Sequence, residues 1–293
     1  MNCYCSTGCF RGMGLRDIVR LACKYNLPLE LSSALPFVSN MLEPVFQSRS
    51  EINLLVHNYF PPPEVPFTLN LASLNQDTYA RSIKHCMAAI DLCAALGSPF
   101  YSVHAGFALE MEPDMLGDPV IQAKLAASSR VEKRTAYEAF IQAVRQLASY
   151  AVENKVGLLI ENNVVAPENV SSNGEYPMLL ADVYEIQGFF NEFGHLGIGL
   201  LLDVGHAKVT ANSLDQRPEA YFDELKAFIR CLHLSDNDGV RDTNSAFNRQ
   251  AWFMPHLKEL LSVPIVLEVN CRSLEELLEL RCLIIEMSGD CPY

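Results

Sequence analysis

The segment 199–206, Gly-Leu-Leu-Leu-Asp-Val-Gly-His, places a carboxylate at the end of a short apolar run and an imidazole three residues later. The run has the length of a buried strand, and a carboxylate at its end is costly unless a cationic group meets it. Gly205 allows the chain to turn sharply after the strand. We therefore expect Asp203 and His206 to face the same mouth.

The same pattern, an apolar run that ends in a metal-ligating side chain, recurs along the chain. In each case an apolar or small residue lies two positions earlier, and the side chains are His57, His104, Glu161, Asp203, His233 and Glu268. Alternate residues of a strand share a face, so the six are predicted to meet at one rim. Three carboxylates in that position repel one another unless they are protonated or bind a cation. A divalent metal with oxygen and imidazole ligands satisfies them, and Glu30, which ends a similar alternation, could orient a pocket residue.

Eight apolar runs are predicted to be the strands that carry these side chains. They cover 3–7, 27–32, 52–57, 100–104, 156–161, 197–203, 230–235 and 264–269, and helical periodicity predicts helices over 14–25, 76–96, 130–154, 177–193, 218–229, 249–261 and 273–287. Strands that are apolar on both faces are typical of a parallel sheet covered by helices. Eight such units predict an α/β protein with one (β/α)8 (TIM) barrel domain over 1–293. A doubly wound open sheet is the alternative, but no Gly-x-Gly-x-x-Gly follows the first strand.

The lengths of the connections indicate which end of the barrel is functional. The long connections, 58–75, 105–129, 162–176 and 236–248, all follow strands, whereas helices lead into the next strand after one or two residues. Long loops in compact domains are usually functional or disordered. These loops gather at the carboxyl ends of the strands, where barrel enzymes place their chemistry. Tyr59, Phe60 and Phe107 in two of them are candidates either for stacking on a sugar or for plain packing.

Composition limits the binding partners and the cellular compartment that we expect for the protein. The 293 residues have a formal net charge of −13 and no run of Lys or Arg, which disfavours binding to nucleic acid. No stretch is long and apolar enough to span a membrane, and no basic segment followed by an apolar one begins the chain, so we expect no secretory signal. The ten scattered cysteines are expected to be reduced, buried thiols of a cytoplasmic protein. The sequence is compatible with a homo-oligomer.

Four motifs resemble those of the xylose-isomerase-like barrel superfamily, which includes sugar and sugar phosphate isomerases and epimerases, inosose dehydratases and endonuclease IV. The motifs are Ile-Glu-Asn at 160–162, Leu-Asp-Val-Gly-His at 202–206, His-Leu-Ser-Asp-Asn-Asp-Gly at 233–239 and Leu-Glu-Val-Asn at 267–270. The resemblance covers nearly the whole chain. It is fairly specific for the superfamily and separates its activities poorly.

The resemblance implies a set of site residues. Glu161, Asp203, His233 and Glu268 match four metal ligands, for manganese, magnesium, cobalt or zinc. His206 matches a residue that contacts substrate in the epimerases and a further metal in the nuclease. His57 and His104 match ligands of an additional zinc in the nuclease, and Asp242 matches the aspartate of an Asp-x-His pair that reads Asp-Thr-Asn here. Because Asn244 replaces the histidine, a three-zinc phosphodiesterase is disfavoured.

The chemistry of the residues favours a metal-dependent sugar or polyol isomerase or epimerase. Moving a carbonyl, or inverting the carbon beside it, removes a carbon-bound proton, and a metal that chelates the carbonyl and the adjacent hydroxyl stabilises the resulting charge. An acid and a base must reach that carbon, and we assign these roles to Glu161 and Glu268. An inosose-dehydratase-like lyase and an endonuclease IV-like metal phosphodiesterase remain alternatives. Arg241 is a candidate for binding a substrate phosphate, although no glycine-rich phosphate loop is present.

Overall fold

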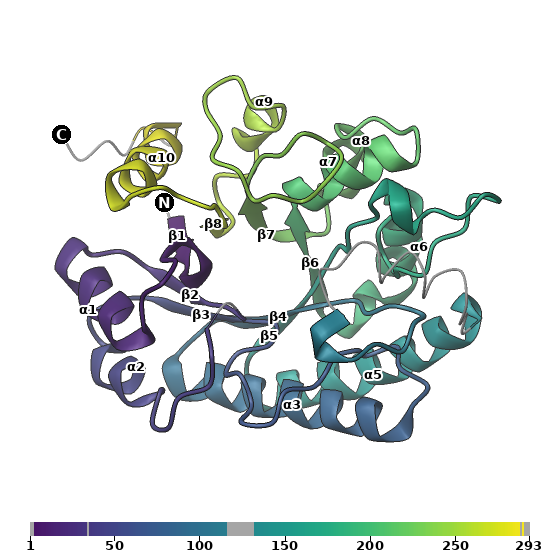
Figure 1. Ribbon diagram of the computed structural model, residues 1–293, viewed down its shortest axis with the longest axis horizontal. Helices are drawn as coiled ribbons and strands as arrows, with labels where there is room; N and C mark the ends of the chain where they lie inside the picture. Colours follow the sequence, from purple (N-terminus) through teal and green to yellow (C-terminus); the bar gives the residue numbers. More distant parts are fainter. Residues whose placement is uncertain (1–2, 34, 116–131, 288, 290–293) are drawn as a thin grey trace.

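Eight parallel strands form a closed barrel in the order of the chain (Figure 1). The computed structural model describes residues 3–33, 35–115, 132–287 and 289. The strands are β1 (Cys3–Ser6), β2 (Leu29–Leu31), β3 (Leu54–His57), β4 (Phe100–His104), β5 (Gly157–Glu161), β6 (Ile198–Asp203), β7 (Ile229–Leu234) and β8 (Ile265–Leu267). Cys5 of β1 is paired with Leu29 of β2 on one side and with Leu267 of β8 on the other, and this pairing closes the ring. The predicted (β/α)8 barrel is thus confirmed.

Helices surround the strands on the outside of the barrel (Figure 1). They are α1 (Leu15–Tyr25), α2 (Glu43–Ser48), α3 (Gln76–Leu96), α5 (Lys133–Glu153), α6 (Val183–Phe193), α7 (Val204–Ser213), α8 (Ala220–Leu225), α9 (Met254–Leu257) and α10 (Leu274–Met287), with short 3-10 turns η1 (Thr7–Cys9), η2 (Pro113–Met115), η3 (Pro167–Asn169) and η4 (Gly194–Leu196). Residues 130 and 131 of the helix predicted over 130–154, and 116–129 of the long loop, lie outside the described residues. Within the described ranges, no helix has both the length and the hydrophobicity to cross a membrane.

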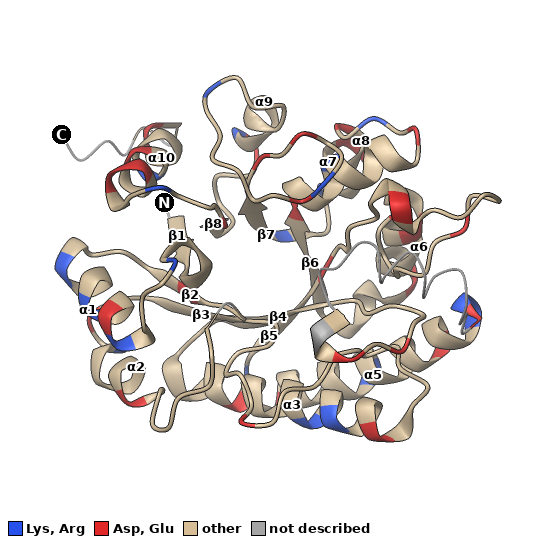
Figure 2. Ribbon diagram, viewed as in Figure 1, with Lys and Arg blue, Asp and Glu red and all other residues tan. Residues whose placement is uncertain are grey.

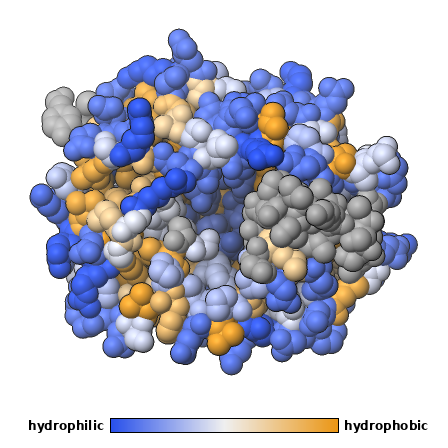
Figure 3. All heavy atoms as spheres, viewed as in Figure 1, coloured by the Kyte–Doolittle hydropathy of each residue, from blue (hydrophilic) through white to orange (hydrophobic). Residues whose placement is uncertain are grey.

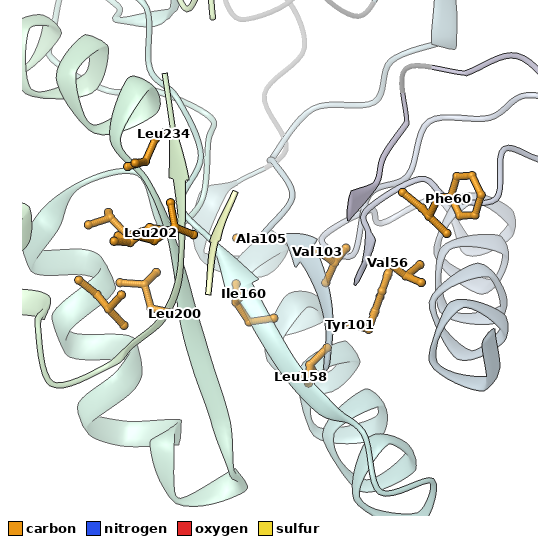
Figure 4. Close-up of a cluster of buried hydrophobic side chains, with 14 of the residues drawn as sticks. Val56, Phe60, Tyr101, Val103, Ala105, Leu158, Ile160, Leu200, Leu202 and Leu234 are labelled. Atoms are coloured by element: carbon orange, nitrogen blue, oxygen red, sulfur yellow. The ribbon is translucent and has the colours of Figure 1, made fainter. Parts of the chain in front are cut away.

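Two separate clusters of buried side chains hold the barrel together. The larger one lies between strands and helices, and Figure 4 shows part of it, with Leu158 and Ile160 of β5 and Leu200 and Leu202 of β6. The smaller one fills the barrel interior with inward-facing side chains, which are Tyr4, Leu55, Phe100, Leu159, Leu201, Cys231 and Val266. Alternation along each strand therefore divides apolar residues between the two clusters. Two positions after Leu55, Leu159, Leu201, Cys231 and Val266 lie the predicted site residues His57, Glu161, Asp203, His233 and Glu268.

Several elements differ from the prediction, and helices α2 and α7 were not predicted. Gly205 does not make a sharp turn, because α7 begins at Val204 directly after β6; Cβ at Gly205 would lie 2.6 Å from Ser235 Oγ, so close packing requires the glycine. The helix predicted over 177–193 begins only at 183, because the Asp182 side chain accepts hydrogen bonds from the Tyr184 and Glu185 N–H groups. The helix predicted over 249–261 has only the four residues of α9, which begins with a proline in its first turn.

Candidate metal centre

Four adjacent strands bring Glu161, Asp203, His233 and Glu268 to one point of the barrel mouth. Glu161 and Asp203 end β5 and β6, His233 lies on β7 opposite Asp203, and Glu268 follows β8 directly. One ligand atom from each residue lies within 4.8 Å of the other three. Figure 2 marks acidic positions in red on β6 and beside β8. The parallel strands therefore assemble three carboxylates and one imidazole from 108 residues of chain, 161–268.

His233 has its two ring nitrogens in different surroundings. Nε2 lies 2.9 Å from Glu30 Oε2 on β2, across the barrel. Nδ1 lies 2.7 Å from Glu268 Oε2 and 3.7 Å from both Glu161 Oε1 and Asp203 Oδ2. When Nε2 donates its proton to Glu30, the Nδ1 lone pair faces the carboxylates. A histidine that donates to a carboxylate with one nitrogen and offers the other as a ligand is the usual arrangement at metal sites.

Unsatisfied buried atoms show that the donor set fits a divalent cation. Glu161 Oε2 and Asp203 Oδ2 are buried and form no hydrogen bond with the residues that the structure describes, and His233 Nδ1, also buried, lies 2.7 Å from Glu268 Oε2. Buried polar atoms of this kind normally find a partner. Two buried carboxylate oxygens without such a partner, with an imidazole nitrogen in the same cluster, are atoms that manganese, zinc or magnesium would satisfy.

The pKa values of the three carboxyl groups differ in direction. Burial raises the pKa of Glu161 well above its usual range and raises the pKa of Asp203 to about 6. Burial also opposes ionisation of Glu268, but the adjacent charge of His233 outweighs it and holds the pKa of Glu268 below its usual range. In the protein alone, the three carboxyl groups therefore differ in how readily they ionise, as expected for like charges brought together in a buried place.

A second set of ligands shares Glu161 with the first. His57 Nε2 and His104 Nε2 both lie 3.3 Å from Glu161 Oε2, and the three residues form another group whose geometry suits a metal ion. His57 Nδ1 is 3.0 Å from Ser102 Oγ, which orients the ring. Burial and the charge of His233 lower the pKa of His57 to about 3, so its imidazole is neutral and available as a ligand.

His206 and Asp242 lie on the other side of Glu161. His206 Nδ1 is 2.9 Å from the Asn162 carbonyl oxygen and 3.6 Å from Glu161 Oε1, and Nε2 is 3.3 Å from Asp242 Oδ2. The Asn244 side chain accepts a hydrogen bond from Ser235 Oγ instead of joining this pair. Of the residues predicted at the rim, the structure therefore brings together His57, His104, Glu161, Asp203, His206, His233, Asp242 and Glu268.

A model of the xylose isomerase-like TIM barrel family matches residues 45–276, which is most of the chain. The chain belongs to this family. No curated protein matches the chain in sequence.

Members of known structure share the fold of this xylose isomerase-like barrel. It is similar to a D-tagatose 3-epimerase-like protein at 16% identity, with a TM-score of 0.70 over 99% of this chain and 97% of that one. A D-psicose 3-epimerase from Clostridium cellulolyticum H10, with D-tagatose, is 13% identical with a TM-score of 0.66 over 99% of both chains. A protein from Thermus thermophilus, soaked with ZnCl2, is 20% identical with a TM-score of 0.61 over 99% of both.

Some predicted residues of this xylose isomerase-like barrel have other roles in packing. Arg241 pairs with Glu168 of η3 at 3.3 Å and so connects two loops above the mouth. Phe60 is fully buried, and Tyr59 stacks on His85 with ring centroids 5.1 Å apart. No sequence pattern indicates the cavity that lies beside Glu268 between the loops after β1 and β2, because the side chains that line it come from irregular segments without periodicity.

Proposed function

We propose that Glu161, Asp203, His233 and Glu268 hold a divalent ion, and that the protein is a metal-dependent isomerase or epimerase of a sugar or related polyol. The observation that carries the proposal is the convergence of four ligand atoms within 4.8 Å, together with buried oxygens of Glu161 and Asp203 that form no hydrogen bond with described residues. The ion would be manganese, magnesium, cobalt or zinc, since all accept oxygen and imidazole ligands. It would polarise a substrate carbonyl and its neighbouring hydroxyl.

Glu268 is placed to move the proton. Its side chain is 25% exposed, whereas that of Glu161 is 1% exposed, so Glu268 reaches both the cluster and the open cavity beside it. We assign to Glu268 the removal of the proton from the carbon next to the carbonyl. Glu161, three strands away around the barrel, would return a proton from the other side. His206, held by Asn162 and Asp242, would bind a substrate hydroxyl.

The comparisons support this choice of substrate class. Two structural neighbours are named as a D-tagatose 3-epimerase-like protein and a D-psicose 3-epimerase with D-tagatose, so barrels of this shape accommodate ketoses. The zinc-soaked neighbour from Thermus thermophilus supports testing zinc beside manganese.

Two measurements test the proposal. Calorimetry with manganese and zinc should detect at least one bound ion, and a panel of ketoses, aldoses and inososes in deuterium oxide should reveal incorporation of deuterium at a substrate carbon. Loss of water from the substrate would identify the lyase alternative, which begins with the same proton removal. Absence of metal binding, or of carbon exchange with every sugar, would contradict the proposal.

A metal phosphodiesterase is a second candidate, because the group of His57, His104 and Glu161 adds a second set of ligands that shares one carboxylate with the first. Two ions bridged in this way can stabilise the attacking and leaving oxygens of a phosphoryl transfer. Bis(4-nitrophenyl) phosphate, assayed with the zinc-loaded protein, tests it. We expect no cleavage of abasic duplex DNA, since a net charge of −13 opposes the approach of a polyanion. Efficient nicking would overturn that expectation.

A further inference from the structure

A cavity of about 710 Å³ adjoins the candidate metal centre. One wall is the segment from η1 to the start of α1, with Phe10 and Met13, and the other is the connection from β2 to α2, with Leu35, Val38 and Met41. Glu268 belongs both to the ligand cluster and to the lining of this cavity. A molecule bound at the ion can therefore extend directly into it.

The cavity presents more apolar than polar surface, although Thr7, Ser39, Asn40, Asn244 and Asn270 also line it. A sugar carries a hydroxyl on nearly every carbon, and burying hydroxyls against apolar side chains without partners is costly. Here Phe10, Met13, Leu35, Val38 and Met41 supply apolar surface, and Val38 remains 58% exposed. Figure 3 shows hydrophobic atoms beside the hydrophilic central hollow, over the part of the molecule around α1. Ligand pockets that enclose drug-sized molecules have volumes of roughly 300–1,000 Å³, so the cavity can hold a substantial apolar group.

The charged residues that line the cavity indicate which ligand charge it favours. Among the described lining residues, Glu268 is the acidic one, while Arg11 and Arg16 are basic. Arg16 is paired with Glu43 at 3.3 Å, and no ion pair or hydrogen bond of Arg11 with another described residue is observed. With Glu43 counted, the charges of the described residues at this cavity cancel, so an uncharged apolar group is favoured.

From the shared Glu268 and the apolar walls, we infer that the substrate is an amphipathic sugar derivative, with its polar part at the ion and an apolar, uncharged substituent in this cavity. The inference rests on the proposed function, since the ion fixes the polar end. Its substrate class differs from the free ketoses named for the structural neighbours. The apolar substituent would contribute to binding, and the proton transfer would proceed at the other end of the molecule.

A matched pair of chelators tests the inference without knowledge of the sugar. Acetohydroxamic acid and 4-phenylbutyrohydroxamic acid present the same two oxygens to a metal, and only the second carries an apolar tail. Calorimetry with the manganese-loaded protein should show the tailed compound binding at least about tenfold more tightly, because burial of two methylene groups alone is worth about that factor. Equal affinities would overturn the inference and leave the metal assignment intact.

Variants of both walls locate the effect. Val38→Asp and Met13→Asp should each bring the ratio of the two affinities towards one, because a carboxylate replaces apolar surface at the tail. Val65→Asp is the matched control, since Val65 is also an exposed loop valine, 68% exposed, and lies outside the cavity lining; its ratio should equal that of the wild type. A ratio unchanged in both wall variants would overturn the inference. Binding of neither compound would overturn the metal assignment, and the inference with it.

Discussion

Leu159 and Glu161 lie on the same inward face of β5, two residues apart, and have opposite surroundings. Leu159 belongs to the apolar cluster inside the barrel, with Leu201 and Cys231 of the next two strands. Glu161 lies two positions after Leu159, Asp203 two after Leu201 and His233 two after Cys231. These three residues belong to the candidate metal centre. Two residues of a strand span only about 7 Å. The lower layer, with Leu159, Leu201 and Cys231, thus stabilises the closed barrel. The upper layer, with Glu161, Asp203 and His233, places ligands that need a cation. Substitutions in the two layers should therefore alter stability and function separately.

The largest effect is expected from the upper layer. Glu268→Gln keeps the shape of the side chain and removes its basicity, so deuterium exchange into the substrate should fall by at least about 10²-fold, with a much smaller change in substrate affinity. Metal content is measured in parallel, because loss of the ion together with activity would assign the residue to binding alone. Glu279→Gln on α10 is the control, since Glu279 is exposed far from the centre. Exchange at the wild-type rate in Glu268→Gln would remove this residue from the mechanism.

The lower layer should respond in stability instead. Leu201→Ala removes a fully buried side chain from the barrel interior, and such truncations cost about 2–5 kcal/mol in the free energy of unfolding. Urea denaturation measures this loss, and calorimetry should still find the same number of bound ions. Val152→Ala, at a position 67% exposed, should change stability by less than about 0.5 kcal/mol. An equally small effect for Leu201→Ala would show that the two layers do not divide the roles in this way.

Glu30 connects the two halves of the barrel through His233, and its effect should be intermediate. Glu30→Gln weakens the acceptor that fixes the Nε2 proton, so the metal dissociation constant should rise about 10- to 100-fold. Competition with a fluorescent zinc chelator measures the change. Glu43→Gln replaces an exposed glutamate that pairs only with Arg16 and Gln47 among the described residues, and it should leave metal affinity unchanged. Wild-type affinity in Glu30→Gln would mean that His233 is positioned by packing alone.

The smallest effect is expected from adding a ligand to the upper layer. Asn244→His places an imidazole near His206 and Asp242, and should create weak binding of one further zinc ion. Asn244 has a φ of 47°, a conformation that histidine also tolerates better than most residues. Metal titrations of the variant and of the wild type give the number of ions that each binds. If the number of bound ions does not increase, the Asn244 side chain is not directed at this pair.

The strands and their polar ends could be predicted from the sequence because inward-facing residues alternate with outward-facing ones, and ligand side chains interrupt that alternation. Helix α7 was missed, since its residues are buried on several sides and include glycine and β-branched residues, so neither amphipathic periodicity nor propensity identifies it. The contact between Glu30 and His233 joins positions 203 residues apart, and no local pattern encodes such a pairing. Glu30 was predicted to orient a pocket residue, without its partner.

The ring closure between β1 and β8 has a consequence for the order of assembly. The proposed ligands lie in the second half of the chain, and the carboxylate that orients His233 lies on β2. During synthesis, Glu30 emerges long before its partner, and Glu268 is the last of the proposed ligands to emerge. A growing chain therefore cannot complete the centre until Glu268 has been synthesised, and the ion would be acquired only after that point. Under the proposed function, metal uptake would thus report that the two ends of the barrel have met.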